Sequence, residues 1–503
     1  MSVEKFSKLK RHLKKIHDIE SAAAVLIWDQ NTHLPPGGAP ARGEQIGQLR
    51  SVAHELWTAK ELSQLLDELS GYENSCGHTS FAASLIRRAR RSYLQETCVP
   101  QDFVERFSEH VSQTYNAWIT ARPDNDFKRM IPYLEKTVAL SQERAGFSTG
   151  FDHVADALID LSDEGMTVAK LLPIFNRLQD ELKTLSAQIE ARQDKGPDPL
   201  AGRFDIAKQE KLATDIVAKL GYDFSRGRLD KTHHPFMIKF SNGDVRITTR
   251  YRENDITEAV FSTIHEAGHA MYEQGVAAEL EGTLLAHGAS SGVHESQSRL
   301  WENMVGRSLP FWQHFYPLLQ NFFPEPFARL SLPQFYRGIN RVERALIRTD
   351  ADEVTYNLHV IIRFNLELKL LEGKLKVADL AEAWRESYST ALGVAPPDDR
   401  DGVLQDVHWY GDFIGGQFQG YTLGNVMAAQ FFASAEKALP HLGDDLASGN
   451  FLSLRSWLTQ NLYSHGAKYT ADELLKQATG ADLSVEPYLN YLKQKYLSPE
   501  LAG

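Results

Sequence analysis

The stretch NDITEAVFSTIHEAGHAMYEQG, residues 254–275, contains the clearest structural signal in the chain. Its apolar residues recur three and four positions apart, which is the spacing of one face of an amphipathic helix. Asp255 precedes the apolar run as a candidate N-cap, Glu258 follows three residues later, and Gly275 stands where a helix would end. We therefore expect one capped helix over this stretch.

The segment directly before it, PFMIKFSNGDVRITTRY at 235–251, predicts a β-hairpin. Two alternating apolar and polar segments flank Asn242 and Gly243, a pair that favours the positive φ angles of a tight hairpin turn. We place strands near 236–241 and 245–251. The hairpin should therefore lead straight into the helix.

Elsewhere apolar residues recur mostly at helical spacing, with little strand-like alternation. The predicted fold is mainly α: a large helical globule with a small β-sheet beside the helix at 254–275. We expect a single domain over residues 1–503, with a helical part at 1–230 and the chemical motifs at 231–503. Proline and glycine at 32–42 predict a loop there.

Composition narrows the classes of function. The 503 residues carry a formal net charge of -12, which disfavours nucleic acid, because phosphate binding needs clustered Lys and Arg. Cys76 and Cys98 are too few for a disulfide scaffold and too far apart for a thiolate zinc site. No stretch approaches the roughly 18 apolar residues of a membrane span, and no signal peptide is evident. We expect a cytoplasmic protein without membrane or nucleic-acid partners.

The pentapeptide His-Glu-Ala-Gly-His, which begins at His265, predicts a zinc site on a helix. His265 and His269 lie on one helical face, so both imidazoles can reach one ion, while Glu266 projects about 100° around the axis. A catalytic zinc ion keeps one position for water, and Glu266 could accept the proton of that water. The small Ala267 and Gly268 leave room at the site. The alternative is that two structural histidines fall at this spacing by chance.

A third ligand must come from elsewhere, because the extended metzincin pattern is missing after His269. The best candidate is Glu295 in VHESQSRLWEN, at the start of another helical segment in which Glu295, Arg299 and Glu302 share a face. Its carboxylate would complete a site of two histidines and one glutamate. Alternatively, Glu295 is an exposed acid that the helix dipole favours.

Further segments spread along the chain carry a wider pattern. They are WDQNTHLPPGGAPAR at 28–42, His234-Pro235-Phe236, Asp244-Val245-Arg246-Ile247-Thr248, His294-Glu295-Ser296-Gln297, Ile347-Arg348-Thr349-Asp350-Ala351-Asp352 and Gly402-Val403-Leu404-Gln405-Asp406-Val407-His408-Trp409. With the pentapeptide, they make the chain resemble the carboxypeptidase Taq family of zinc carboxypeptidases. The resemblance runs from near the N-terminus to near the end.

This resemblance implies a mostly helical fold with a deep substrate groove, similar to neurolysin and angiotensin-converting enzyme. It implies a homodimer that releases single C-terminal residues from peptides with broad specificity. One zinc ion would serve each subunit, with cobalt as a substitute. Position by position, the resemblance makes His265, His269 and Glu295 the metal ligands and Glu266 the general base.

An enzyme that acts at C-termini must recognise a free carboxylate, and the planar guanidinium of arginine can donate two parallel hydrogen bonds to it. Arg348 is the first candidate, because it lies in a family-like segment beside Asp350 and Asp352, which could orient it. Arg246 on the hairpin is the second candidate. The alternative for any single arginine is a structural ion pair. We expect His234 to position the substrate or to support the site; the alternative is that it caps a strand.

The transition state places negative charge on the former carbonyl oxygen, so the site needs a hydrogen-bond donor besides the metal. His408 and Tyr421 are candidates in the stretch QDVHWYGDFIGGQFQGYTLGN, which is rich in glycine and aromatic residues. Asp406 could fix the tautomer of an imidazole, and Asp244 could support the site or belong to its turn. The alternative for Tyr421 is a core aromatic residue.

The residues by themselves also allow two other functions. One is a zinc endopeptidase or a peptidase that releases dipeptides, because the same metal core serves all of these enzymes. The other is a non-catalytic protein that binds peptides. The preferred terminal residue, the physiological substrate and the choice among zinc, cobalt and manganese are not readable from the sequence.

Overall fold

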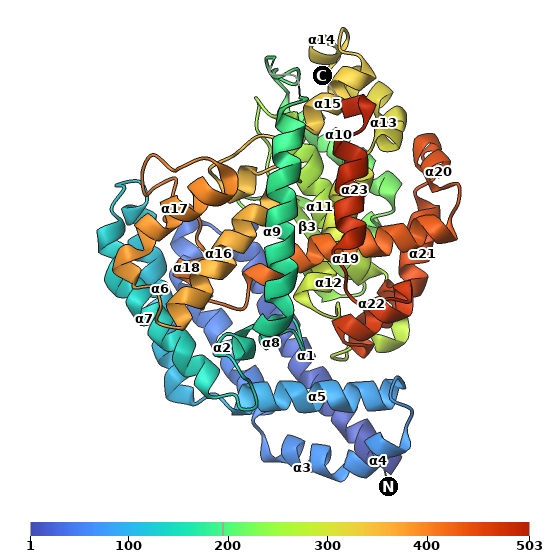
Figure 1. The fold of residues 1–503 in the computed structure, drawn as a ribbon. Coiled ribbons are helices and arrows are strands. Elements are labelled where there is room, and N and C mark those ends of the chain that lie inside the picture. Colours follow the sequence, from blue (N-terminus) through green and yellow to red (C-terminus); the bar gives the residue numbers. More distant parts are fainter. Residues whose placement is uncertain (1, 194–195, 502–503) are drawn as a thin grey trace. The chain divides into compact units, whose positions relative to one another are not determined.

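Helices dominate the computed structural model, which describes residues 2–193 and 196–501 (Figure 1). One three-stranded sheet accompanies them, so the predicted fold class, mainly α with a small sheet, is confirmed. None of the helices in these two ranges is long and apolar enough to cross a membrane. The substrate groove stays a prediction.

The chain divides into two compact units, each assembled from three separate segments. Unit 1 comprises Met1–Thr97, Pro197–Ile339 and Ala428–Leu483, and unit 2 comprises Cys98–Gly196, Asn340–Met427 and Ser484–Gly503. This division does not follow the predicted parts 1–230 and 231–503, because packing between distant segments, rather than chain order, defines the units. That the whole chain is one catalytic domain stays a prediction.

In unit 1, α1 (Ser2–Thr32) packs along α2 (Ala39–Trp57). The buried face of α1 presents Leu9, Leu13 and Ile16 at helical spacing to a cluster of aliphatic and aromatic side chains. Besides α11 (Ile256–Gln274) and α12 (Ser291–Arg299), which follow the sheet, the other helices of this unit are α3 (Lys60–Glu68), α4 (Ser70–Ser75), α5 (Phe81–Thr97), α10 (Ile206–Leu220), α13 (Leu309–Phe322), α14 (Pro324–Phe327), α15 (Leu332–Ile339), α20 (Leu442–Ser448), α21 (Leu452–Asn461), α22 (Ala471–Thr479) and the C-terminal part of α19 (Phe418–Ala438).

The loop predicted at 32–42 is shorter than expected. The chain leaves α1 after Thr32, makes a short 3-10 turn at Pro36–Gly38 and enters α2 at Ala39. Pro40 lies in the first turn of α2, where a missing N–H costs no intrahelical hydrogen bond. The sequence signal therefore marked a helix start as well as a loop.

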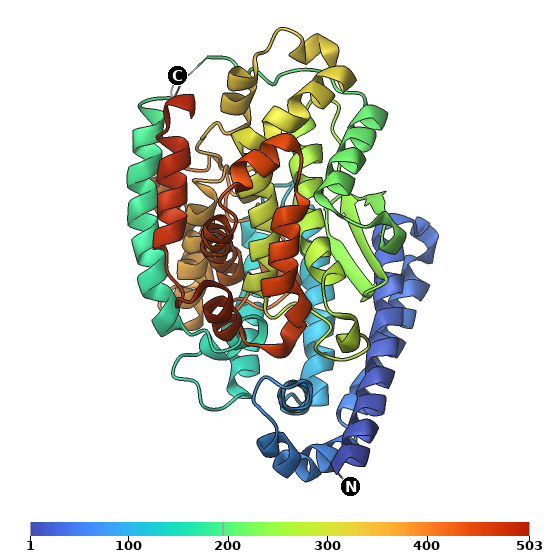
Figure 2. The ribbon, with the colours of Figure 1, turned by 90° about the vertical axis from the view of Figure 1, so that its right-hand side faces the viewer.

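The sheet has the order β1-β3-β2 and contains the predicted hairpin. Strand β2 (Met237–Ser241) pairs antiparallel with β3 (Asp244–Thr249), with Met237 opposite Ile247. The sequence analysis missed β1 (Leu229–Lys231), which pairs parallel with β3 and is too short to show an alternating pattern. Figure 2 shows the sheet between α1 and α11, both of which contact its strands.

Helix α11 (Ile256–Gln274) follows the hairpin, as predicted. Its N-cap is Asp255, whose Oδ1 accepts hydrogen bonds from the backbone N–H groups of Thr257 at 2.8 Å and Glu258 at 3.2 Å. The side chain of Glu258 pairs with Arg252 at 2.7 Å, so this carboxylate anchors the entering chain. Helix α12 (Ser291–Arg299) packs against α11 and continues into a π-helical turn at Leu300–Gly306.

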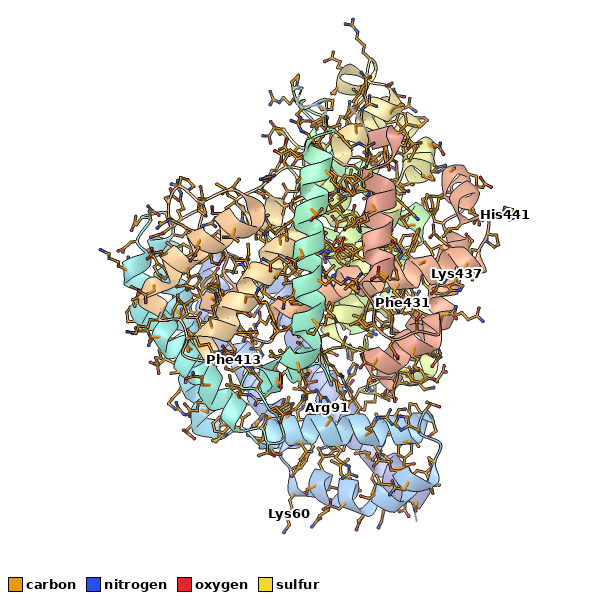
Figure 3. All side chains as sticks on the ribbon, in the orientation of Figure 1. Lys60, Arg91, Phe413, Phe431, Lys437 and His441 are labelled. Atoms are coloured by element: carbon orange, nitrogen blue, oxygen red, sulfur yellow. The ribbon has the colours of Figure 1, made fainter. Side chains whose placement is uncertain are left out.

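Among its described residues, unit 2 contains helices and connecting loops but no strand. Helices α9 and α23 run side by side in both ribbon views (Figures 1 and 2). Phe413, labelled in Figure 3, stacks on Phe107 with ring centroids 3.9 Å apart. The helices of this unit are α6 (Gln101–Ala121), α7 (Phe127–Gly146), α8 (Asp156–Ser162), α9 (Val168–Glu190), α16 (Tyr356–Leu371), α17 (Leu380–Leu392), α18 (His408–Gly411), α23 (Glu486–Tyr496) and the N-terminal part of α19.

Candidate functional site

Three predicted metal ligands converge in unit 1. The Nε2 atoms of His265 and His269, one turn apart on α11, lie 3.6 Å and 3.4 Å from Oε2 of Glu295. One ligand atom from each of the three side chains lies within 4.8 Å of the other two. Two imidazole nitrogens and a carboxylate oxygen in this arrangement fit a zinc-type ion with one position left for water or substrate.

Glu295 is presented by the first turns of α12, which begins after the N-cap Ser290. The carboxylate is buried, so it is not the exposed helix-terminal acid of the alternative interpretation. Gly268 permits the approach of α12, because a Cβ atom at this position would lie 2.6 Å from the carbonyl oxygen of Gln297. The glycine of the pentapeptide therefore serves helix packing rather than open room at the metal position.

The second nitrogen of His265 is held by Glu302 in the π-helical turn. Nδ1 of His265 lies 2.9 Å from Oε2 of Glu302, and this carboxylate also lies 3.3 Å from Nη1 of Arg299 and 3.5 Å from Nη2 of Arg307. An ionised carboxylate can only accept, so Nδ1 carries the hydrogen and Nε2 is left as the metal-binding atom. Burial opposes ionisation of Glu302, but Arg299 and His265 lower its pKa to about 2.

The second nitrogen of His269 begins a longer chain of contacts. Its Nδ1 lies 2.6 Å from Nδ1 of His294, whose Nε2 lies 2.9 Å from Oε1 of Glu273. The other carboxylate oxygen of Glu273 pairs with Lys239 of β2 at 2.9 Å. If His294 donates to Glu273, its Nδ1 accepts from Nδ1–H of His269, and the Nε2 atom of His269 is free for the metal. We name this chain the His269 relay.

Burial and charge give the four central groups different proton affinities. Burial raises the pKa of Glu266 to about 7 and lowers the pKa of His269 to about 4. Burial would also raise the pKa of Glu295, but Arg299 and the two histidines lower it. For His265, burial is outweighed by Glu295 and Glu302, which raise its pKa. An ionised Glu295 and a neutral His269 are the protonation states that bind a metal.

The hairpin residues predicted to bind substrate are placed in the same unit. Arg246 on β3 pairs with both carboxylate oxygens of Asp244 at 2.8 Å and 2.7 Å, and its guanidinium lies 4.3 Å from the ring centroid of Trp28. These contacts are those of the structural ion pair considered as the alternative. His234 is exposed in the segment between β1 and β2. Roles for both in substrate binding stay predictions.

Arg348, Asp406, His408 and Tyr421 form a second cluster, in unit 2. Arg348 is buried and donates from Nε to Oδ2 of Asp406 at 2.7 Å and from Nη1 to the hydroxyl of Tyr356 at 3.0 Å. The prediction that the aspartates at 350 and 352 orient it is wrong. The first is exposed, and the second accepts hydrogen bonds from the start of α16.

Asp406 also holds His408, as the sequence analysis suggested for an imidazole. Its Oδ1 makes a short hydrogen bond with Nδ1 of His408, whose Nε2 lies 3.1 Å from the hydroxyl of Tyr421. With Nδ1 donating to the carboxylate, a neutral His408 must accept the proton of the Tyr421 hydroxyl. Of the two candidates for an oxyanion donor, only Tyr421 then has a hydrogen to offer.

The family model of the carboxypeptidase Taq (M32) metallopeptidases matches residues 8–496. The chain belongs to the carboxypeptidase Taq family. It is 39% identical over 489 residues to thermostable carboxypeptidase 1 of Thermus thermophilus, with 95% of each chain covered. It is 37% identical over 487 residues to carboxypeptidase 1 of Bacillus subtilis, with 96% of each covered.

Solved structures agree with this assignment to the carboxypeptidase Taq family. The crystal structure of an M32 carboxypeptidase from Deinococcus radiodurans matches with a TM-score of 0.95 and 47% identity, covering 98% of this chain and 99% of that one. As a family member, the protein is a metallocarboxypeptidase, a hydrolase that acts on peptides. The candidate ligand set accords with the metal that the family requires.

The sequence analysis missed several residues that support these clusters. Glu273 follows His269 by four residues on α11, so a longer reading of the same helix face could have found it. Lys239 on β2 carried no such signal, because its partner is distant in sequence. Arg363 interrupts the apolar run HVIIRFNLEL, and an arginine there signals a buried charge.

Proposed function

We propose that this protein is a zinc carboxypeptidase that removes single C-terminal residues from peptides with broad specificity. The observation that carries the proposal is the convergence of the two histidine Nε2 atoms on Glu295, with Glu266 adjacent on the same helix. In each histidine ligand, the ring nitrogen that faces away from the metal position is held by a neighbouring side chain, Glu302 for His265 and His294 for His269, which favours a preformed site.

The metal would be held by His265, His269 and Glu295, one ion per subunit. Zinc suits two imidazoles and a carboxylate, and cobalt accepts the same donors. When bound, the ion supplies Lewis-acid polarisation of the scissile carbonyl and makes water a stronger acid. Side chains of the protein would transfer the proton, bind the terminal carboxylate and stabilise the developing oxyanion.

Glu266 is the proposed general base. It lies one residue from a ligand and projects from α11 about 100° away from it, so its carboxylate can flank the ion rather than bind it. It accepts a proton from the attacking water and delivers that proton to the leaving amine as the peptide C–N bond breaks. Its burial keeps bulk water away from this exchange.

Arg348 is the proposed partner of the substrate's terminal carboxylate. Two of its donors are engaged by Asp406 and Tyr356, and among the described residues Nη2 has no hydrogen-bond partner. That nitrogen can donate to a carboxylate while the other bonds keep the guanidinium fixed. Arg246 and His234 are proposed as secondary contacts with the peptide.

Tyr421 is the proposed donor to the developing oxyanion, with His408 and Asp406 behind it. When the hydroxyl turns from His408 to the substrate oxygen, it places a hydrogen bond where charge develops in the transition state. We also propose a cytoplasmic location and a homodimeric assembly, of which the assembly rests on the family resemblance.

The test is mass spectrometry of an unblocked peptide incubated with the zinc-loaded protein, beside its C-terminally amidated twin and a chelator control. We expect a ladder of single-residue losses from the free C-terminus, abolished by chelator and by amidation. Internal cuts or dipeptide losses would replace the proposal with an endopeptidase or a dipeptide-releasing enzyme. Stoichiometric zinc without any cleavage would favour the peptide-binding protein.

A further inference from the structure

Arg363 is a buried charge that the proposed mechanism does not use. It projects from α16 and has 0% exposure. None of its three guanidinium nitrogens has a hydrogen-bond partner in the described part of the chain. Burying a charged guanidinium without hydrogen bonds costs free energy, so the surrounding groups must stabilise the charge by other interactions.

Three aromatic rings provide part of that compensation. The guanidinium carbon of Arg363 lies 4.7 Å, 5.1 Å and 4.9 Å from the ring centroids of Trp384, Trp409 and Phe418, which we call the aromatic cage. Cation–π contacts of this kind strengthen in a site without water. They hold the planar group in place without using its N–H donors.

The remaining compensation comes from Asp406. Nη2 of Arg363 lies 3.3 Å from Oδ2 of Asp406, a charge contact without hydrogen-bond geometry. The same oxygen accepts the hydrogen bond from Nε of Arg348, while the other oxygen holds His408. Two guanidiniums therefore share one carboxylate oxygen.

A second acidic residue, Glu367, lies near the two arginines but does not fully neutralise their positive charge. Glu367, four residues after Arg363 on α16, is buried, and burial raises its pKa to about 7 although Trp409 donates to it at 2.6 Å. His359, four residues before Arg363, has its pKa lowered to about 3 by burial and by the two arginines. With Asp406 ionised, the cluster keeps a net positive charge at neutral pH.

We propose that Arg363 is a positioning residue of the carboxylate subsite: held in the aromatic cage, it offsets the charge of Asp406, so that Asp406 can orient Arg348 without cancelling its attraction for the substrate's terminal carboxylate. Without Arg363, the full charge of Asp406 would act on Arg348 alone and weaken that attraction. This inference rests on the proposed role of Arg348.

The test compares the affinities of a peptide with a free C-terminus and its amidated twin. Binding is measured by calorimetry on the zinc-loaded protein in the Glu266→Gln background, so that the peptide is not consumed. The readout is the preference ratio, which is the Kd of the amide divided by the Kd of the acid. Arg348→Ala is expected to abolish the preference. A ratio unchanged by Arg348→Ala would refute the proposed role of Arg348, and this inference with it.

Neutral and charged replacements then test Arg363. Arg363→Met and Arg363→Gln should each lower the ratio about tenfold, the order of effect seen for residues that orient a binding group. Arg363→Lys should keep most of it, because the charge remains. The inference is wrong if Arg348→Ala abolishes the preference but Arg363→Met and Arg363→Gln leave the ratio at the parent's value. It is also wrong if Arg363→Lys lowers the ratio as much as Arg363→Met does. In either case the proposed function stands.

A double variant tests the route through Asp406. In the Asp406→Asn background, Arg363→Met should change the ratio less than about twofold, because the charge that it offsets is gone. If Arg363→Met lowers the ratio by the same factor in the Asp406→Asn background as in the parent, the two residues act independently and the inference is overturned. The matched control is Arg385→Met, an exposed arginine of α17 that pairs with Asp399, and it should leave the ratio unchanged.

Discussion

Glu273→Gln is the sharpest perturbation of the His269 relay. The carboxylate is 3% exposed and accepts from Lys239, from His294 and from the backbone N–H of Gly288, each at 2.9 Å. The amide keeps the shape and one acceptor oxygen, but it leaves the ammonium of Lys239 buried without a counter-charge. Breaking a buried pair in this way costs about 3–5 kcal/mol of unfolding free energy.

The double variant Glu273→Gln with Lys239→Met should recover at least about 2 kcal/mol of that loss, because replacing both members of a buried pair by neutral groups is often close to neutral. Urea unfolding of the metal-free protein measures each variant. The control is Asp18→Asn, which breaks the exposed i,i+4 pair with Lys14 and should cost under about 1 kcal/mol.

The relay also predicts an effect on metal affinity. His294 orients His269, so Glu273→Gln should weaken zinc binding about 10- to 100-fold, or roughly 1.4–2.7 kcal/mol, measured by competition with a chelator. If the losses in unfolding free energy of the two single variants simply add in the double variant, or if zinc affinity does not change, the reasoning about the relay is refuted.

Other predictions concern catalysis, metal and pH. Glu266→Gln should bind zinc normally but lose at least about 10²-fold in kcat, and near-normal turnover would remove it as the base. Tyr421→Phe should lower kcat about 10²- to 10³-fold with little change in KM; an effect on KM alone would contradict the oxyanion role. Removing zinc should lower the unfolding free energy, by about 2.7 kcal/mol relative to protein with free zinc at 100 times its Kd, and no shift would argue against a specific site. Burial raises the pKa of Glu367 to about 7 in the folded chain, above its usual 4.5, so stability should fall as pH rises from 4.5 through 7, by on the order of 3 kcal/mol. Glu367→Gln should remove this part of the slope, while the part due to Glu266, whose pKa burial also raises to about 7, remains. An unchanged slope in urea unfolding would exclude Glu367 as a source.

Local patterns were sufficient for the elements that carry the metal ligands. The capped helix at 256–274 and the hairpin before it follow from short-range rules: an N-cap acid, a 3.6-residue apolar period and an Asn-Gly turn. His265 and His269 share a face by helix geometry alone. These features depend on residues close together in the chain, so the sequence by itself determined them. For Glu295, on another helix, the residues left an exposed helix-terminal acid as the alternative, and only the burial of Glu295 and its closeness to the two histidines decided between the two.

Tertiary structure decided what those side chains contact. Lys239 meets Glu273 only because β2 packs on α11, and Gly268 is required only because the backbone of α12 approaches it. Arg348 is oriented by Asp406, 58 residues away, rather than by its sequence neighbours. Burial then shifts the pKa values and turns ordinary ion pairs into tightly held networks. Contacts between distant segments depend on how the whole chain packs, and no local pattern of residues encodes them.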